Sequence, residues 1–511
     1  MNFSGNDMEY IRRHGLSLDE INRQLKILKE GLPPTEVLKP ALVGNGIVRL
    51  NEEQIQKYLS VFEQQNQHYS IEKFVPASGA ATRMFKEWVF FHNNYKPGRD
   101  YYERFVKKHQ LKTFDSELED FLNNLSGFAF YQDLMDVIKQ QEPQLFQLDE
   151  NEQVWQYIHY VLSGDGLGYE QLPKALLKFH RYSNNDCKTS LEEHLVEAQA
   201  YAQGKVHFTI SPQHLQAFTA LTGKLQEKYS VRIEHSYQKP ETDTVMRNPK
   251  TDEIVRDENG NIVFRPGGHG SLIDNIQDLN SDIIFVKNID NVQKGDYQHI
   301  TIKFKKILGG YLIDLMQKAD AFLTILQNEK PVGDELLEIE NFAKNELNIR
   351  FMEGFDTLNN SGKRKYLTYK INRPLRIAGM VKNTGEPGGG PFWAKDKNGI
   401  KSLQIVEKAQ IDLNNPQQKA ILETSTHFNP VDLVLRIKDF KGNKFDLKEF
   451  INEQAAFLAE KSYRGEPVKV YERPGLWNGA MDNWNTVFVE VPLETFSPVK
   501  TVTDLLKPAH Q

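Results

Sequence analysis

The sequence predicts an α/β protein whose central sheet is largely parallel, and three segments carry this prediction. KVHFTIS at Lys205 and SVRIEHSYQ at Ser230 have the pattern of strands, and the helical segment QHLQAFTALTGKLQEKY lies between them. DIIFVKNID at Asp282 is apolar on both faces until it ends in polar residues, which is typical of a strand inside a parallel sheet. Strands and helices that alternate in this way form βαβ units.

The bulk properties are those of a globular protein with a large apolar core. The chain has 511 residues, so we expect one large domain with additions or two to three smaller domains. It carries 63 basic and 69 acidic residues and a net charge of -6, which disfavours a protein that coats a nucleic-acid backbone. Cys187 is the only cysteine, which excludes an intrachain disulfide.

No apolar run approaches the length of about 20 residues that spans a bilayer. The amino-terminal segment MNFSGNDMEYIRRHG also lacks the apolar stretch of a secretory signal. We therefore expect a cytoplasmic protein that does not bind a membrane.

The pattern changes along the chain in four steps. Residues 1–65 are expected to form a helical lead-in, in which Ser17 to Glu20 have a capping-box pattern. Residues 66–511 are expected to form the main domain, with a helical insertion at about 99–163 and a part rich in glycine and proline at about 371–511. Between Val245 and Phe264, turns around Asn248 and Asn259 predict a hairpin.

The segment VPASGAATRMFK at Val75 runs from a predicted strand through small residues into a predicted helix. Small residues let the backbone approach a ligand, and outward-pointing amides suit a polyphosphate, to which Arg83 adds charge. The alternative is a tight strand-to-helix turn that needs small residues for packing.

Three further segments offer polar groups at the ends of predicted elements. Lys174 follows Pro173, so its ammonium group is rigidly placed to neutralise a phosphate, although an ordinary surface lysine would look the same. Gln238 follows a predicted strand, where its amide could recognise a base edge or simply bind the loop. FRPGGHGSL at Phe264 surrounds His269 with glycines, which suits either a bulky ligand or a hairpin exit with positive φ angles.

Asp290 and Asn291 follow the buried strand DIIFVKNID, at the end where open α/β sheets bind their ligands. A single carboxylate there suits one magnesium ion, which binds through one or two carboxylates and substrate phosphates. The alternative is that Asp290 caps the next turn. Near the end of the chain, Lys500 in FSPVKTVTDLL is a second candidate for a phosphate-binding lysine.

Other polar residues lie beside proline and glycine in the last third of the chain. They could shape a ligand pocket, and loop architecture accounts for them equally well. These residues are His427, Asn429, Asp432 and Glu386.

Taken in order, these segments resemble the uridylyltransferases that make UDP-sugars, namely UDP-glucose pyrophosphorylase and UDP-N-acetylglucosamine pyrophosphorylase. PASGAATRM resembles their Gly-rich phosphate loop, LPK their proline-lysine pair, RPGGHGSL their P-P-G-H-G-D loop and NIDN their N-x-D-N at the metal. LQIVEKAQI around Glu407 is similar to the V-V-E-Y-S-E stretch of the acetylglucosamine enzymes. FSPVKTVTDLL closely resembles the F-L-P-V-K-T-x-S-D-L-L of the glucose enzymes. The chain as a whole also looks like a bacterial family of unknown function.

The resemblance implies a GT-A-like fold and a role for each matching residue. Arg83, Lys174 and Lys500 would be catalytic, and Asp290 would bind Mg2+. The expected nucleotide-binding residues are Ala77, Ser78, Gly79, Ala80, Thr82, Gln238, Gly267 and Gly268. The expected sugar-binding residues are His269, Asn291, Glu386 and Glu407.

The sequence departs from that pattern in three places. Ala80 and Ala81 stand where those enzymes have at least one glycine, and the interval from Arg83 to Lys174 is longer, which predicts an added helical subdomain. The lysine motif also lies almost at the carboxyl end, so we expect no C-terminal β-helix after it.

The function implied is transfer of a nucleotidyl group from a nucleoside triphosphate, with UTP favoured, to a sugar 1-phosphate, with release of pyrophosphate. One alternative is a GT-A glycosyltransferase that consumes a nucleotide sugar, and the other is a nucleotide-binding protein without catalysis. A dehydrogenase is disfavoured because PASGAATRM lacks the G-x-G-x-x-G spacing of a dinucleotide loop.

Overall fold

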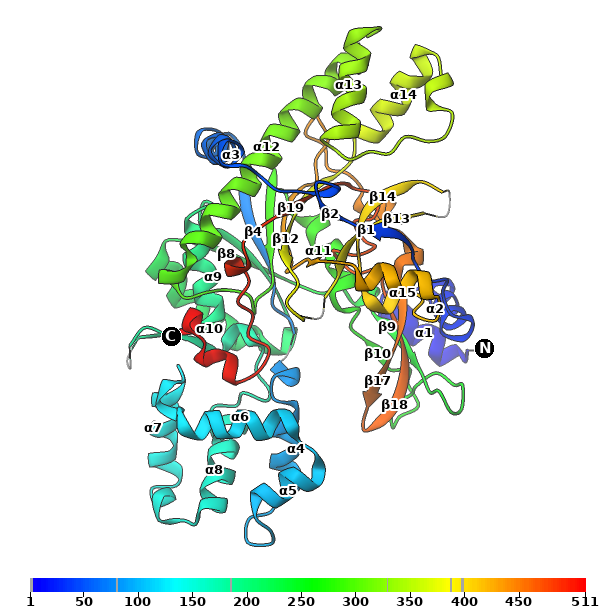
Figure 1. Ribbon diagram of the computed structural model, residues 1–511. Helices are drawn as coiled ribbons and strands as arrows, with labels where there is room; N and C mark the ends of the chain where they lie inside the picture. The colour runs from blue at the N-terminus through cyan, green and yellow to red at the C-terminus, as the bar shows by residue number, and fades with distance from the viewer. Residues whose placement is uncertain (1–2, 80, 184–185, 329, 387, 397–398) are drawn as a thin grey trace. The chain divides into compact units, whose positions relative to one another are not determined.

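A computed structural model describes residues 3–79, 81–183, 186–328, 330–386, 388–396 and 399–511 (Figure 1). The chain forms two compact units. Unit 1 comprises Met1–Phe74, Ser236–Val286 and Lys303–Leu493. Unit 2 comprises Val75–His235, Lys287–Ile302 and Glu494–Gln511.

Unit 1 holds most of the strands. Its helices are α1 (Gly5–Arg13), α2 (Leu18–Glu30), α3 (Glu52–Gln65), α11 (Leu272–Asp278), most of α12 (Gln298–Asn328), α13 (Asp334–Asn345), α14 (Asn360–Ile371) and α15 (Pro416–Glu423). Its strands before residue 300 are β1 (Glu36–Pro40), β2 (Leu42–Val43), β3 (Gly46–Val48), β4 (Ile71–Pro76), β9 (Thr244–Arg247), β10 (Phe264–Arg265) and β11 (Ile283–Lys287). Its later strands are β12 (Leu375–Lys382), β13 (Gly390–Lys395), β14 (Lys401–Val406), β15 (His427–Phe428), β16 (Asp432–Arg436), β17 (Phe457–Tyr463), β18 (Glu466–Glu472) and β19 (Asn485–Glu490).

The central sheet of unit 1 has the strand order β2-β3-β19-β12-β16-β11-β4. The pair β12 and β19 is parallel, with Ile377 opposite Val487, and so is the pair β11 and β4, with Phe285 opposite Lys73. Strand β16 runs antiparallel to β12. The prediction of a mixed α/β protein with a mostly parallel sheet is therefore confirmed, while the assignment to the GT-A type stays a prediction.

Two adjacent glycines let helix α3 approach α12 closely in unit 1, where Figure 1 shows the two helices side by side. A Cβ atom at Gly309 would lie 2.7 Å from the Phe62 ring, so a larger residue would push the helices apart. Tyr58 stacks on Tyr311 with 4.3 Å between ring centroids. Phe62 also contacts Phe285 of β11 edge-on, which attaches α3 to the sheet.

Unit 2 contains the predicted helical insertion and the strand-helix-strand segment. Its helices are α4 (Lys86–Asn94), α5 (Tyr102–His109), α6 (Lys112–Asn123), α7 (Tyr131–Gln141), α8 (Glu150–Leu162), α9 (Ser190–Gln199) and α10 (Leu215–Tyr229). Its strands are β5 (Lys178–Arg181), β6 (Cys187–Thr189), β7 (Lys205–Ile210) and most of β8 (Arg232–Tyr237). Helix α10 separates β7 from β8, as the sequence predicts.

The helices between residues 99 and 163 share one aromatic core with α4. Trp88 contacts the rings of Phe114 and Phe121 edge-on, at 5.6 and 5.1 Å between centroids. Its indole N–H donates to Glu117 at 2.6 Å. Val499 and Val502 from the end of the chain are buried in the same core, so this core also anchors the carboxyl-terminal segment.

Two predictions for the amino-terminal segment need correction. The lead-in is not helical throughout, because β1, β2 and β3 occupy most of residues 36–48. Strands β1 and β3 pair with distant partners, Pro40 with Phe392 and Val48 with Val489, and β2 pairs with β3, so a local pattern does not reveal them. Ser17 does cap α2 by accepting from the Glu20 N–H, but the Glu20 carboxylate binds Arg23 instead of completing a capping box.

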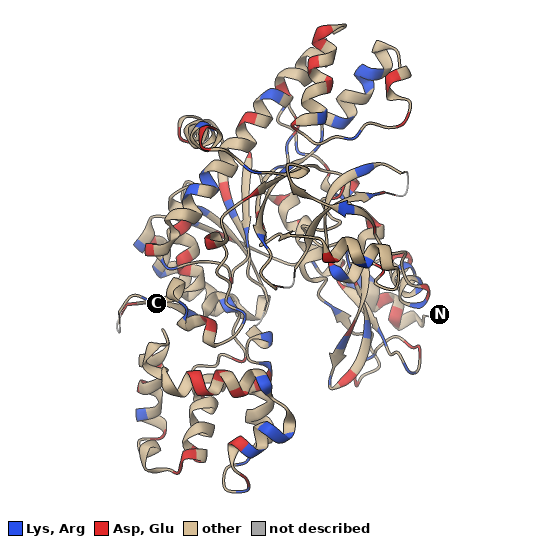
Figure 2. Cartoon of the chain, viewed as in Figure 1, with Lys and Arg blue, Asp and Glu red and all other residues tan. Residues whose placement is uncertain are grey.

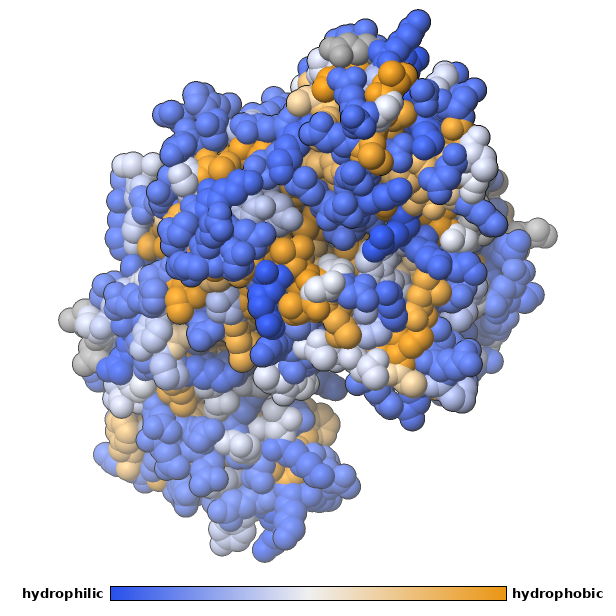
Figure 3. Space-filling model, turned by 45° about the horizontal axis from the view of Figure 1, so that its top comes forward, coloured by the Kyte–Doolittle hydropathy of each residue, from blue (hydrophilic) through white to orange (hydrophobic). Residues whose placement is uncertain are grey.

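Figure 2 shows basic and acidic residues scattered over the helices and strands. Hydrophilic residues predominate on the face shown in Figure 3, and hydrophobic residues lie among them in small groups. Among the described residues, no helix combines the length and apolar character that crossing a membrane requires.

Candidate functional site

Three charged side chains from distant segments meet in unit 2, just beyond the end of β11. The ammonium group of Lys174 lies 3.0 Å from Oδ2 of Asp290, and that of Lys500 lies 2.8 Å from the same oxygen. Asp290 is 8% exposed. We call Lys174, Asp290 and Lys500 the charged cluster.

Lys174 is held from both of its ends. Its side chain, 12% exposed, donates to Asp290 and also to the carbonyl oxygen of Val499 at 2.6 Å. Its own carbonyl accepts from the Ser190 hydroxyl at 2.8 Å, and Pro173 precedes it with φ -73°. Few other positions are open to this ammonium group.

The segment that carries Lys500 is fixed to Asp290 and Asn291 by hydrogen bonds from its backbone N–H groups. The N–H of Val499 donates to the carbonyl of Asp290 at 2.9 Å, and the N–H of Ser497 donates to Oδ1 of Asn291 at 2.9 Å. Because Val499 and Val502 are fully buried, Lys500 lies on the outer side of the segment, where its side chain is 58% exposed. Lys500 can therefore exchange Asp290 for a ligand, whereas Lys174 is locked.

Asp504 is a positioning residue of this segment, and the sequence motifs above assign it no role although it is the aspartate of FSPVKTVTDLL. Its Oδ2 accepts the backbone N–H groups of Lys500 at 2.7 Å and of Thr501 at 2.8 Å. Its Oδ1 binds Lys507 at 2.7 Å. The spacing T-x-x-D in TVTD is a local signal that could have found it.

Burial and charge set the protonation states of the cluster. Burial raises the pKa of Asp290, but the positive charges of Lys174 and Lys500 outweigh it, so the pKa lies below its ordinary value. Burial lowers the pKa of Lys174, although Asp290 acts in the opposite direction. Asp290 is thus ionised at neutral pH, beside two lysines that suit an anionic ligand.

The cluster also fits one divalent cation beside a phosphate. The hydrogen bonds of both lysines go to Oδ2, and Oδ1 of Asp290 takes part in none between the residues that the structure describes. Oxygen of an ionised carboxylate is the ligand type that Mg2+ prefers. The remaining ligands would have to come from a substrate, since two ammonium groups occupy the other oxygen.

The predicted phosphate loop has the expected position between β4 and α4 in unit 2. Its first amide, of Ala77, donates to the carbonyl of Thr209 at 3.0 Å, and the amide of Ala81 donates to Leu172 at 3.3 Å. These two amides are therefore engaged by the protein itself. The exposed residues Gly79, Thr82 and Arg83 remain as candidates for phosphate contact.

Ser78 and Ala80 are the two other expected nucleotide-binding residues of this loop. The carbonyl of Ser78 accepts from the Ser211 hydroxyl at 3.1 Å, which holds the loop near the end of β7. Ala80 lies outside the described residues. Its expected role in nucleotide binding stays a prediction.

The glycine-rich loop before α11 belongs to unit 1, and it packs closely because its glycines have no side chains. A Cβ atom at Gly267 would lie 2.5 Å from the carbonyl oxygen of Thr242, and Gly268 has φ +63°. His269 stacks on Trp477 with 4.4 Å between ring centroids. Its Nε2 lies 4.0 Å from Oε1 of Glu407, so unit 1 brings two expected sugar-binding residues together.

Gln238 follows directly after β8 and is half-buried. The end of this strand is held in unit 1 by Asn275 of α11, whose Nδ2 donates to Ser236 Oγ and to the Tyr237 carbonyl, both at 2.8 Å. The predicted base-reading residue and the glycine-rich loop before α11 are therefore connected through one helix.

Other predicted ligand residues are engaged by the protein. Asn429 donates to the Gly379 carbonyl at 3.0 Å, and Asp432 forms a buried ion pair with Lys305. His427 is 4% exposed and lies 3.3 Å from Glu490. The structure therefore favours loop and sheet architecture over a pocket role for these three. Glu386 is half-buried in the loop after β12, where Thr384 donates to it at 3.0 Å.

Substitution of Gly475 tests how tightly His269 is held. A Cβ atom there would overlap the His269 ring and Oδ1 of Asn478. We expect Gly475→Ala to lower the free energy of unfolding by about 1–3 kcal/mol, as overpacking of a core does. Gly223→Ala in α10 is the control, since no atom lies within 4 Å of its added Cβ, and it should be neutral or stabilising. Equal stability of Gly475→Ala and the native protein in urea unfolding would contradict this packing.

Unit 2 thus contains Lys174, Asp290, Asn291, Lys500 and the phosphate loop with Arg83. Unit 1 contains the other expected residues, namely Gln238, Gly267, Gly268, His269, Glu386 and Glu407. Asn291 is 2% exposed and holds Ser497, which accounts for its position without a sugar, although its Nδ2 has no acceptor among the described residues.

Comparisons with known proteins give one family and several structures. A family model described as Domain of unknown function (DUF4301) matches residues 4–511. A mutant UDP-glucose pyrophosphorylase from Leishmania major in complex with UDP-glucose is 12% identical, with 99% of this chain and 79% of that chain covered and a TM-score of 0.41.

Two structures from Trypanosoma brucei are similar to the same degree. A UDP-glucose phosphorylase is 12% identical, with 98% and 77% covered and a TM-score of 0.44. A uridine diphosphate N-acetylglucosamine pyrophosphorylase in complex with inhibitor is 11% identical, with 96% and 72% covered and a TM-score of 0.44. A search among curated proteins gives no match.

Proposed function

The chain belongs to the DUF4301 family, and we propose that it is a nucleotidyltransferase that joins a sugar 1-phosphate to a nucleoside triphosphate, with UTP favoured. The observation that carries this proposal is the charged cluster, in which Lys174 and Lys500 share one oxygen of the buried Asp290. Support also comes from the order of the motifs along the sequence, from the loop at Ala77 to the segment of Lys500.

The proposed reaction needs positioning and charge rather than a protein nucleophile. An oxygen of the sugar 1-phosphate forms a bond to the α-phosphorus of the triphosphate, and the bond from that phosphorus to the bridging oxygen of the β-phosphate breaks. Pyrophosphate leaves with the electron pair. The locked ammonium of Lys174 and the exposed ammonium of Lys500 stabilise the negative charge on the transferring group, which is where fixed charges contribute most.

Asp290 has two tasks in this proposal. It orients both lysines, and its Oδ1 would hold Mg2+ together with substrate phosphates. Bound Mg2+ would polarise phosphoryl oxygens and neutralise part of their charge.

The other expected residues would bind the parts of the two substrates that do not react. Gly79, Thr82 and Arg83 would contact the triphosphate, since they are the exposed residues of their loop. The sequence motifs alone propose Gln238, Gly267 and Gly268 for the base and His269 with Glu407 for the sugar, and unit 1 brings His269 and Glu407 together.

The proposal is tested by incubating the protein with UTP, Mg2+ and either glucose 1-phosphate or N-acetylglucosamine 1-phosphate, and separating the products by ion-exchange chromatography. We expect a UDP-sugar that requires both substrates and Mg2+. Panels with the other nucleoside triphosphates and sugar 1-phosphates follow if UTP is inactive.

The same panel distinguishes the two alternatives. A glycosyltransferase would consume the UDP-sugar and release UDP, and it would form no pyrophosphate. A non-catalytic binding protein would bind UTP in calorimetry but give no product with any sugar phosphate in the panel. Either result would contradict nucleotidyl transfer.

Asp504 offers a prediction about positioning. Asp504→Ala removes the acceptor for the N–H groups of Lys500 and Thr501, so the turn that carries Lys500 loosens. We expect kcat to fall about tenfold with little change in KM, because Lys500 acts on the transition state. Asp504→Asn keeps one acceptor oxygen and should recover most of the rate.

Lys507→Ala is the control for this prediction. It removes only the exposed ion pair with Asp504, which contributes about 0–1 kcal/mol, so its rate should match the native protein. If Asp504→Ala lowered kcat no more than Lys507→Ala, the positioning role would be refuted.

A further inference from the structure

A cavity of about 280 Å3 lies in unit 1 at the beginning of several strands. Its wall includes Asn485 and Thr486, the first residues of β19, and Lys401 to Leu403, the first residues of β14. Open α/β sheets bind their substrates beyond the carboxyl ends of the strands, whereas this cavity lies at amino ends. None of its lining residues belongs to the charged cluster.

The wall of this cavity is rich in basic groups. Four lining residues are basic, namely Arg350, Lys370, Arg373 and Lys401. Two are acidic, namely Asp396 and Asp482. Helix α14, which carries Lys370, has basic residues and no acidic residue in its sequence NSGKRKYLTYKI (Figure 2). The excess of positive charge indicates an anionic ligand.

Lys370 is the unusual member of this set. It is 8% exposed, yet its ammonium group makes no hydrogen bond or ion pair with any residue that the structure describes. The centroids of the Tyr366 and Tyr369 rings lie 5.6 and 5.9 Å from its Nζ. The ammonium group itself keeps contact with solvent, and Lys370 lines the cavity, so an anionic partner could reach it there.

Burial and neighbouring charges shift the pKa values of the ionisable groups in the cavity wall. Burial lowers the pKa of Lys370 to about 8, the charge of Arg373 acts in the same direction, and Asp396 opposes both. Burial also lowers the pKa of Arg373, whose Nη1 donates to the Asn483 carbonyl at 3.2 Å. Burial raises the pKa of Asp482 to about 6, so this carboxyl is still mostly ionised at pH 7, and Asn452 donates to it at 3.0 Å.

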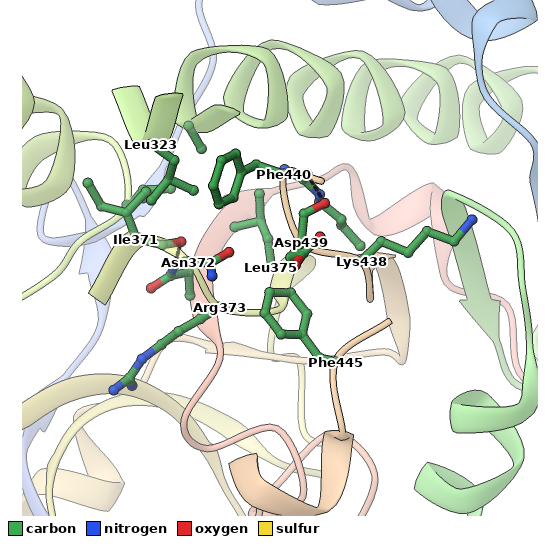
Figure 4. A pocket seen from close by; sticks show the side chains of 13 residues that line it. Leu323, Ile371, Asn372, Arg373, Leu375, Lys438, Asp439, Phe440 and Phe445 are labelled. Carbon is green, nitrogen blue, oxygen red and sulfur yellow. Dashed lines mark hydrogen bonds between the residues drawn. The ribbon is translucent and has the colours of Figure 1, made fainter. Parts of the chain in front are cut away.

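A neighbouring cavity in unit 1 is much smaller and less polar than the one that Lys370 lines. It has a volume of about 10 Å3, room for no more than one water, and apolar side chains such as Leu323 and Phe445 line much of it (Figure 4). Figure 4 shows the Arg373 side chain extending away from this small cavity. Arg373 therefore directs its charge to the larger cavity, whose wall it also lines.

We propose that the larger cavity binds a small phosphomonoester, whose phosphate pairs with Lys370 and Arg373. A phosphate supplies several acceptor oxygens and two negative charges, which match an unpaired ammonium and a neighbouring guanidinium. The volume of about 280 Å3 holds a compound of the size of a sugar phosphate, and Tyr366 and Trp484 supply apolar wall for its carbon skeleton. This site goes beyond the proposed transfer reaction and does not depend on it.

The test is isothermal titration calorimetry of the full chain at pH 7 with ribose 5-phosphate, inorganic phosphate and ribose. We expect ribose 5-phosphate to bind more tightly than inorganic phosphate, and ribose not to bind. Lys370→Met should weaken the binding of ribose 5-phosphate at least tenfold. Lys365→Met, on the exposed side of α14, is the matched control and should leave it unchanged.

Three further measurements establish whether the phosphate binds in this cavity. Lys401→Gln at the exposed rim should weaken binding about threefold, which keeps the test valid if Lys370→Met fails to fold. Raising the pH from 7 to 9 should weaken binding about tenfold, since Lys370, whose pKa burial lowers to about 8, loses its proton over this range. Lys500→Ala should have no effect.

The proposal is overturned if ribose 5-phosphate does not bind, or if Lys370→Met and Lys401→Gln bind it like the native protein. Binding that Lys500→Ala abolishes would place the phosphate at the charged cluster and would also overturn it. Tighter binding of inorganic phosphate than of ribose 5-phosphate would restrict the site to the free ion and contradict the phosphomonoester.

Discussion

Lys500→Ala is expected to lower the turnover number of the transfer reaction at least about 100-fold, the usual size of one preorganised charge at a transition state. The ammonium of Lys500 lies 2.8 Å from Asp290, and its side chain is 58% exposed, so a substrate phosphate can reach it. The same exposure means that the fold does not depend on it. We expect the free energy of unfolding to change by less than about 1 kcal/mol.

The measurement is steady-state kinetics with pyrophosphate detection, accompanied by urea unfolding. Lys139→Ala is the control, because Lys139 is similarly exposed, at 67%, in unit 2 and forms a surface ion pair with Asp136. This control should keep native activity. If Lys500→Ala were as active as Lys139→Ala, Lys500 would have no role in the chemistry.

Asp290→Asn is expected to have the larger effect, since it removes the only carboxylate of the charged cluster. Lys174 would keep its bond to the Val499 carbonyl but lose its charged partner in a buried site. Leaving one buried charge unpaired typically costs about 3–5 kcal/mol, and we expect the unfolding free energy to fall by about that amount. Turnover should fall at least about 100-fold, because both lysines lose their orientation.

Asp290→Asn should also weaken the effect of Mg2+ on UTP binding in calorimetry, since an amide binds Mg2+ less well than a carboxylate does. Asp296→Asn is the control from the same segment, where Asp296 is 74% exposed and pairs with Lys294. Native stability and native turnover of Asp290→Asn would show that the charged cluster is neither structural nor catalytic.

The sequence allowed the central elements to be predicted where their signals are local. The order of β7, α10 and β8, and the hairpin of β9 and β10, follow from periodicity and turn residues. Strands β1 and β3 could not be predicted in this way, because they pair with residues more than 300 positions away, such as Val48 with Val489, and β2 in turn pairs with β3. Short segments of this kind carry too little pattern of their own.

The sequence predicts the individual residues of the charged cluster but not their meeting. Each of its members could be nominated from its position after a proline or a buried strand, as with Lys174 and Asp290. Their meeting at one carboxylate oxygen is a product of tertiary structure, since their positions lie more than 100 residues apart. Asp504 has a local signal of its own, in the T-x-x-D spacing after Lys500.

Lys370 marks the limit of prediction from sequence. Within NSGKRKYLTYKI it is one lysine among several, and most lysines on a helix are exposed. Its burial results from packing of α14 beside strands that begin more than 30 and 110 residues later, at Lys401 and Asn485. No periodicity in the helix distinguishes it.

The most direct test of the central claim is release of pyrophosphate from UTP that depends on an added sugar 1-phosphate. The native protein should release pyrophosphate with at least one sugar 1-phosphate of the panel in the presence of Mg2+, and the rate with Lys500→Ala should be at least about 100-fold lower. Absence of pyrophosphate with every triphosphate and sugar 1-phosphate, or equal release by the native protein and Lys500→Ala, would contradict the account.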